Sequence, residues 1–226
     1  METRFKNRQQ AGQFLGDLLS KRLTDSNDVI VLALPRGGVP VGYEVAQRLG
    51  APLDVFVVRK LGVPGHEELA MGAIASGGVR VLNQRVVQFM PINQAMIERV
   101  VARETEELRR REQLYRGDRP PPEVEGKTVI LIDDGLATGA TMRAAAEALR
   151  QRRPRRLIVA VPVAAPETCE EFRGVVDEIV CGRTPEDFVA VGMWYQDFSQ
   201  TTDEEVRELL QHNAAEHPAP TAAAHS

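Results

Sequence analysis

The segment VILIDDGLATGAT, residues 129–141, predicts both the fold and the position of a site. Residues 129–132 are apolar, as in a buried strand of a parallel sheet. Two carboxylates, Asp133 and Asp134, follow where that strand ends, and a loop of small residues then leads into the helical pattern MRAAAEALRQRR. A strand, a tight loop and a helix start form an anion cradle, because backbone N–H groups converge there and the helix dipole points at the ligand.

The residue types in this loop indicate a phosphorylated sugar. Gly139 lets the backbone approach a ligand closely, and the hydroxyls of Thr138 and Thr141 add hydrogen-bond donors. The acid pair cannot bind phosphate, but it suits sugar hydroxyls, Mg²⁺ or a developing positive charge. A nucleotide P-loop is excluded because it requires a lysine after its last glycine, and here Ala140 follows.

The segment resembles the 5-phosphoribosyl-1-pyrophosphate (PRPP) signature of the type I phosphoribosyltransferases. The resemblance implies that Asp133 and Asp134 hold the ribose hydroxyls and take a catalytic role. It also implies that they hold Mg²⁺ through PRPP or water. The 5′-phosphate would lie on the loop formed by Ala137, Thr138, Gly139, Ala140 and Thr141.

Length and composition predict one enzyme-sized domain. The chain has 226 residues, 43% hydrophobic and 27% charged, with a net charge of −4. The acidic balance argues against a nucleic-acid partner, and the apolar runs are too short to span a bilayer. The N-terminus lacks the apolar core of a signal peptide, so we expect a cytoplasmic protein. We expect Cys169 and Cys181, the only cysteines, to be reduced thiols rather than a disulfide.

Strand and helix patterns alternate along the chain, which predicts a mostly parallel twisted α/β sheet flanked by helices. The expected domain covers residues 1–212, with a core over 28–184 and a small hood formed by the N-terminal helix and 185–212. Residues 213–226 are expected to be a disordered tail. The expected helices are 9–23, 40–49, 92–116, 142–153, 167–176 and 202–210. The expected strands are 28–34, 53–60, 71–75, 79–83, 129–132, 156–163 and 177–182.

A second loop, ALPRGGVPVG at residues 33–42, follows the first core strand and opens a helix. Gly37 and Gly38 permit close backbone approach, and Arg36 supplies a permanent charge. This loop resembles the pyrophosphate loop of the same family, in which many members have a cis peptide before the basic residue. We therefore predict a cis peptide at Pro35–Arg36 and a catalytic role for Arg36 on the leaving group.

Residues 59–73, RKLGVPGHEELAMGA, resemble the flexible lid loop of the family. The resemblance implies that Arg59 and Lys60, at the base of the lid, neutralise pyrophosphate. Proton handling would fall to a lid residue, Glu67 or alternatively Glu68, because Ala137 occupies the position where hypoxanthine and guanine enzymes usually carry an aspartate. The alternative is a surface hairpin with solvated charges.

Residues 187–198, DFVAVGMWYQDF, resemble the part of purine phosphoribosyltransferases that carries a base-stacking aromatic residue and a later acid near the metal. This implies base contacts from Phe188 and Trp194 and a metal contact from Asp197. The alternative is that the aromatic residues form the core of the hood.

The resemblance implies Mg²⁺-dependent transfer of the 5-phosphoribosyl group from PRPP to a small nitrogenous acceptor, such as a nucleobase, with release of pyrophosphate. It also implies a homodimer. Two alternatives stay open, a regulatory protein that senses PRPP without turnover and an enzyme of the same fold acting on another phosphorylated sugar.

Overall fold

The computed structural model describes residues 3–23 and 28–217. A sheet of five parallel strands lies at its centre, which confirms the predicted fold class. From edge to edge the strands are β2 (Leu53–Val55), β1 (Val29–Ala33), β6 (Thr128–Ile132), β7 (Arg156–Val163) and β8 (Glu178–Arg183). Within the described parts of the chain, no helix is long and apolar enough to cross a membrane.

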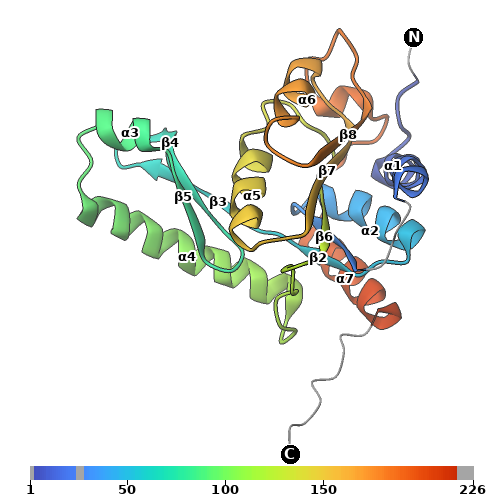
Figure 1. Cartoon of the computed structure of the whole chain (residues 1–226), viewed down its shortest axis with the longest axis horizontal. Helices are drawn as coiled ribbons and strands as arrows, with labels where there is room; N and C mark the ends of the chain where they lie inside the picture. The colour runs from blue at the N-terminus through green and yellow to red at the C-terminus, as the bar shows by residue number, and fades with distance from the viewer. Residues whose placement is uncertain (1–2, 24–27, 218–226) are drawn as a thin grey trace, which may run out of the picture.

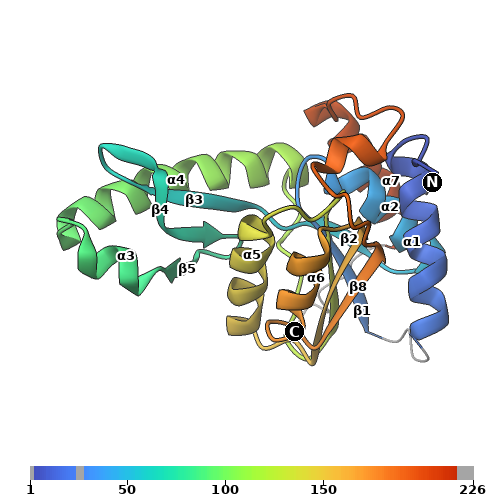
Figure 2. The same ribbon diagram turned by 90° about the horizontal axis from the view of Figure 1, so that it is seen from above.

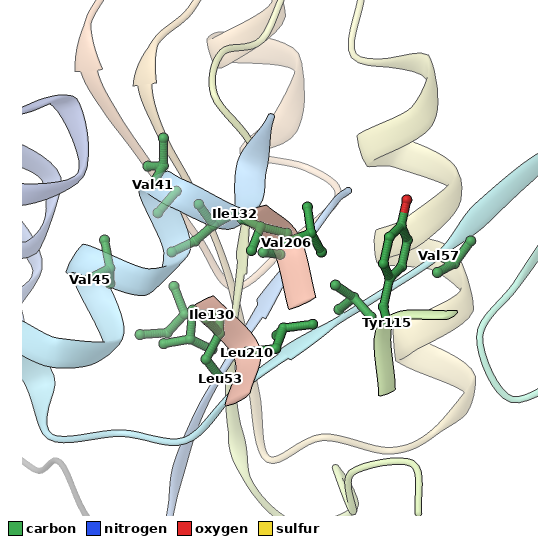
Figure 3. Packing of buried hydrophobic residues seen from close by; sticks show 14 of the residues in the cluster. Val41, Val45, Leu53, Val57, Tyr115, Ile130, Ile132, Val206 and Leu210 are labelled. Atoms are coloured by element: carbon green, nitrogen blue, oxygen red, sulfur yellow. The ribbon is translucent and has the colours of Figure 1, made fainter. Parts of the chain in front are cut away.

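Helices cover both faces of this sheet, because successive side chains of each buried strand point to opposite faces. Ile130 and Ile132 of β6 pack into one hydrophobic cluster, and Val129 and Leu131 pack into the other. The first cluster includes residues of α1 (Arg8–Arg22), α2 (Gly38–Leu49) and α7 (Asp203–Glu216), together with residues of the long helix α4 (Gln94–Arg116), and part of it is drawn in Figure 3. The second includes residues of α5 (Ala140–Gln151) and α6 (Pro166–Phe172).

A second, antiparallel sheet forms an arm that extends away from the main sheet (Figure 1). Its strands are β3 (Val58–Val63), β4 (His66–Ala75) and β5 (Val79–Leu82), and they lie beside α3 (Gln84–Phe89) and α4 (Gln94–Arg116). The single strand predicted over 53–60 is therefore wrong, because β2 and β3 belong to different sheets, and the strand predicted over 71–75 begins earlier, at His66. The chain leaves the main sheet after Val55 and turns back at Gly65, whose φ of +81° suits a tight hairpin turn.

Three further expectations are corrected. The helix predicted over 167–176 ends at Phe172, and α3 was not anticipated. The tail was expected to be disordered from residue 213, but α7 continues to Glu216, with its start capped by the Thr202 hydroxyl; residues 218–226 lie outside the described part. Cys169 and Cys181 form a disulfide instead of free thiols, because the packing of α6 beside β8 places their Cα atoms 6.5 Å apart.

Candidate functional site

Two glycine-containing loops meet at the carboxyl end of the main sheet. The strand order reverses between β1 and β6, because β2 lies outside β1 on one side while β7 and β8 continue on the other. At such a reversal the loops after the two strands diverge and leave a ligand crevice. Ala33 pairs with Ile132, and Leu34 N–H donates to the Ile132 carbonyl at 2.9 Å. The loop after β1 and the acid pair after β6 therefore begin side by side.

Because glycine has no Cβ, the acid pair can lie against the first loop at Gly37 and Gly38. A Cβ at Gly37 would overlap Asp134 Oδ2, and one at Gly38 would lie 3.2 Å from Asp133 Oδ1. The peptide between Pro35 and Arg36 is cis, as predicted. Both carboxylates thus point toward the loop for which the resemblance implies pyrophosphate binding.

Burial dominates the electrostatics of the acid pair. Burial raises the pKa of the Asp133 carboxyl well above its ordinary value, and the charge of Asp134 raises it further. Burial also raises the pKa of Asp134, although the guanidinium of Arg8 opposes this effect. The Tyr195 hydroxyl donates to the Asp134 carbonyl at 2.6 Å and fixes the backbone there. The ionised form of the pair is therefore unfavourable, and a ligand that donates hydrogen bonds would stabilise it.

Arg8 is a residue of this site that the sequence reading missed. Its Nε donates to Asp134 Oδ2 at 2.8 Å and its Nη1 donates to the Ser199 carbonyl at 2.7 Å. The guanidinium carbon lies 4.0 Å from the ring centroid of Phe198, and the side chain is only 12% exposed. Arg8 opens α1, where a cation opposes the helix dipole. That unfavourable placement was the one sequence signal for a specific partner.

The predicted phosphate loop has the expected geometry at the start of α5. Gly139 caps the helix with a φ of +71°, which glycine adopts without strain. A cavity of about 640 Å³ opens between α5 and the arm. Thr138, Ala140 and Thr141 line it together with Lys60 of β3. The structure thus brings Lys60 to the same cavity as the phosphate loop; Figure 2 shows the arm beside α5.

Two other residues of the predicted lid lie elsewhere. Arg59 points away from Lys60 and forms an ion pair with Glu104 of α4, with Nη2 and Oε2 2.7 Å apart. Glu67 lies next to the hairpin turn, where it accepts a hydrogen bond from Gly65 N–H and lines a separate cavity of about 450 Å³. Arg36 pairs with Asp203 at the start of α7, with Nη1 and Oδ1 3.8 Å apart.

The predicted base-binding aromatic residues pack within the hood. Phe188 and Trp194 lie against a small cluster that contains Phe5 and Tyr195. Phe5 N–H donates to the Trp194 carbonyl at 2.9 Å, so the N-terminal segment and the segment after β8 form one layer. Asp197 is exposed and accepts a hydrogen bond from Ser199 N–H at 2.9 Å. The contacts of Phe188 and Trp194 are thus those of the alternative prediction, in which the aromatic residues form the core of the hood.

Comparison with known proteins gives consistent matches. Residues 3–196 match the family described as phosphoribosyl transferase domain. A Mycobacterium tuberculosis protein, provisionally named a phosphoribosyl transferase, is 44% identical over 206 residues, which are 91% of this chain and 46% of that protein. This chain therefore spans about half the length of the curated relatives that it matches first.

Two further matches cover different shares of the chain. One match is the crystal structure of TT1426 from Thermus thermophilus, with a TM-score of 0.82 and 44% sequence identity to this chain. The match covers 93% of this chain and 99% of that one. A Chloroflexus aurantiacus protein named bifunctional protein PyrR is 34% identical over 129 residues, which are 56% of this chain and 65% of that protein.

Proposed function

Because the chain belongs to the phosphoribosyl transferase domain family, we propose that it transfers the 5-phosphoribosyl group from PRPP to a nitrogenous acceptor. The contact between the acid pair and the Gly37–Gly38 loop carries this proposal. One carboxylate-lined face for ribose hydroxyls, beside one backbone cradle for a phosphate and another for pyrophosphate, matches the three parts of PRPP.

The residues take the following roles in the proposed reaction. The loop 137–141 holds the 5′-phosphate by its backbone N–H groups and threonine hydroxyls. The C1–O bond breaks with its electron pair leaving on pyrophosphate, which Arg36, Lys60 and the backbone at Gly37 stabilise. Asp133 and Asp134 stabilise the positive charge that develops on the ribose. The nitrogen lone pair of the acceptor then forms the new C–N bond, and the acceptor loses a proton.

The acid pair also fits the Mg²⁺ that the resemblance implies. Buried carboxylates next to a pyrophosphate cradle are the oxygen ligands this ion uses together with substrate phosphates. In the described residues no three His, Cys, Asp or Glu side chains gather into a metal site. Asp133 and Asp134 would therefore share the ion with donor oxygens and water, and it would neutralise pyrophosphate charge. Asp197, Arg59, Glu67, the base contacts and the homodimer stay predictions.

Titration of the purified protein with PRPP, with and without Mg²⁺, tests the proposal. We expect binding that depends on Mg²⁺, and pyrophosphate release when the correct nitrogenous base is added. Binding with no release across purine and pyrimidine bases would replace the transferase by a PRPP sensor. Absence of binding in both conditions would move the site to another phosphorylated ligand.

Replacing Gly37 by alanine is expected to weaken PRPP binding about tenfold, the effect of about 1.4 kcal/mol. The new methyl group would overlap Asp134 Oδ2 and lie 2.8 Å from Asp134 Cγ, so the carboxylate or the loop must move. The φ of Gly37 is −60°, so alanine adds no backbone strain. Calorimetric titration measures the change.

The matched control for this substitution is Gly174→Ala, where a Cβ meets only the Glu171 carbonyl at 4.0 Å. We expect that variant to bind PRPP as the original chain does. If the Gly37→Ala variant binds PRPP as tightly as this control, PRPP binding does not depend on the close approach between the acid pair and the first loop.

A further inference from the structure

The disulfide connects a short helix to the edge strand of the main sheet. Cys169 lies in the short helix α6 and Cys181 lies in the edge strand β8. Both side chains are half-buried, at the border of the hydrophobic cluster that also holds α5. They are the only cysteines in the chain, so no other intramolecular pairing competes. Within the chain, the only possible product of its reduction is therefore the free pair.

Helix α6 is also the support of the phosphate loop. The Thr168 hydroxyl, one residue before Cys169, donates to the Ala137 carbonyl at 2.5 Å. Phe172 is fully buried, and its ring lies where a Cβ on Gly139 would come within 2.7 Å. Arg143 of α5 pairs with Glu171 of α6, with Nη2 and Oε2 2.9 Å apart, and lies over the Phe172 ring. The position of α6 thus determines the conformation of the loop 137–141.

The disulfide is the covalent tie between this support and the sheet. The helix has seven residues, too few to be stable by itself in water, so its place depends on its packing and on that tie. Opening the bond leaves the Phe172 packing but removes the constraint next to Thr168. We expect the helix to sample more positions and the Ala137 carbonyl to lose its fixed partner for part of the time.

We propose that Cys169 and Cys181 form a thiol–disulfide exchange site whose redox state sets the affinity of the phosphate loop for its phosphorylated ligand. The co-reactant is a dithiol. One of its thiolates attacks a protein sulfur, the S–S bond breaks to a mixed disulfide, and the second thiolate displaces the other protein sulfur. Two electrons and the two protons of the dithiol end on the protein thiols, and the dithiol leaves as a disulfide. The inference rests on the proposed function for the identity of the ligand only.

The test compares the oxidised protein with protein reduced by dithiothreitol and then freed of reductant under argon. PRPP affinity in the presence of Mg²⁺ is measured by calorimetry, and amide hydrogen exchange of residues 137–141 is measured without ligand. We expect reduction to weaken binding about fivefold or more, the lower end of common coupling between sites, and to speed exchange in the loop. Titration of free thiols confirms each redox state.

Two variants separate the coupling from a general loss of structure. The Cys169→Ser/Cys181→Ser variant should resemble the reduced protein and ignore dithiothreitol. Thr168→Val should bind weakly in both states, because it keeps the size of the side chain but removes the hydrogen bond to Ala137. Far-UV circular dichroism verifies that each variant is folded.

Where PRPP binds, equal affinity in the two redox states would overturn the inference, as would free thiols that persist in the air-oxidised protein. A protein that binds PRPP in neither state contradicts the proposed function instead. In that case the exchange of residues 137–141 alone decides whether the disulfide controls the loop.

Discussion

Replacing both Asp133 and Asp134 by asparagine is expected to lower PRPP affinity about a hundredfold while leaving the protein at least as stable. The loss corresponds to about 2.7 kcal/mol, and hydrogen bonds to a charged group contribute about 1.5–3 kcal/mol each. Asparagine keeps the volume of the side chain but removes the charge that would hold ribose hydroxyls and share Mg²⁺. Calorimetric titration and thermal unfolding measure the two quantities.

The opposite signs of the two effects follow from burial. Burial raises the pKa of both carboxyls, so the folded state disfavours their ionised forms relative to the unfolded chain. At neutral pH the ionised pair therefore lowers the free energy of unfolding. This destabilisation decreases as the pH drops through the raised pKa values. The neutral amides remove that cost. Arg8 loses the charge of Asp134 but keeps the Ser199 carbonyl and the Phe198 ring.

The single variant Asp134→Asn is expected to lower turnover at least about tenfold, which is about 1.4 kcal/mol of transition-state stabilisation. Asp17→Asn is the control, since Asp17 is an exposed residue whose partner is Arg48 on the surface. Near-normal turnover of the Asp134→Asn variant would remove this acid from the reaction. If the double variant binds PRPP as tightly as the control, neither carboxylate belongs to the donor site.

Local signals explain why the core of the site was predictable. The strand 128–132, the acid pair and the loop 137–141 are contiguous, and each follows from side-chain pattern or turn chemistry over a few residues. The Gly37–Gly38 loop also has a local pattern, whereas its cis peptide was predicted only from the resemblance to the pyrophosphate loop of the family. The meeting of these two loops follows from the rule that ligands bind where the strand order of a parallel sheet reverses.

The parts that were missed depend on contacts between distant residues. Arg8 meets Asp134 across 126 positions, and no local pattern specifies that pairing. Arg59 and Lys60 are neighbours with similar charge, but alternation along β3 sends one to Glu104 and the other to the cavity beside α5. The disulfide depends on the packing of α6 next to β8, which cysteine spacing alone does not reveal.

Replacing Gly139 by alanine is the second substitution with a large expected effect, a loss of PRPP affinity of about a hundredfold, or about 2.7 kcal/mol. Two causes act together. A left-handed backbone costs a residue with a Cβ about 1–2 kcal/mol. In addition, the new Cβ would lie 2.7 Å from Phe172 Cε2 and 2.9 Å from Thr168 Cγ2.

Neither of these neighbours can yield easily. Phe172 is fully buried within the cluster that supports α5, and the Thr168 hydroxyl is bound to the Ala137 carbonyl. Crowding a packed core costs about 1–3 kcal/mol, so the loop moves away from α6 instead. That displacement reorients the backbone N–H groups that would bind the 5′-phosphate.

Gly126→Ala is the control, because it introduces the same backbone strain outside the site. Gly126 has a φ of +72°, almost the same as the +71° of Gly139, but a Cβ there meets nothing within 4 Å. The backbone strain should lower the free energy of unfolding of both variants, which thermal unfolding measures. Only the Gly139→Ala variant should lose PRPP affinity in calorimetric titration. If the two variants bind PRPP equally well, the phosphate does not depend on the close fit between this loop and α6, and the 5′-phosphate must be placed elsewhere in the site.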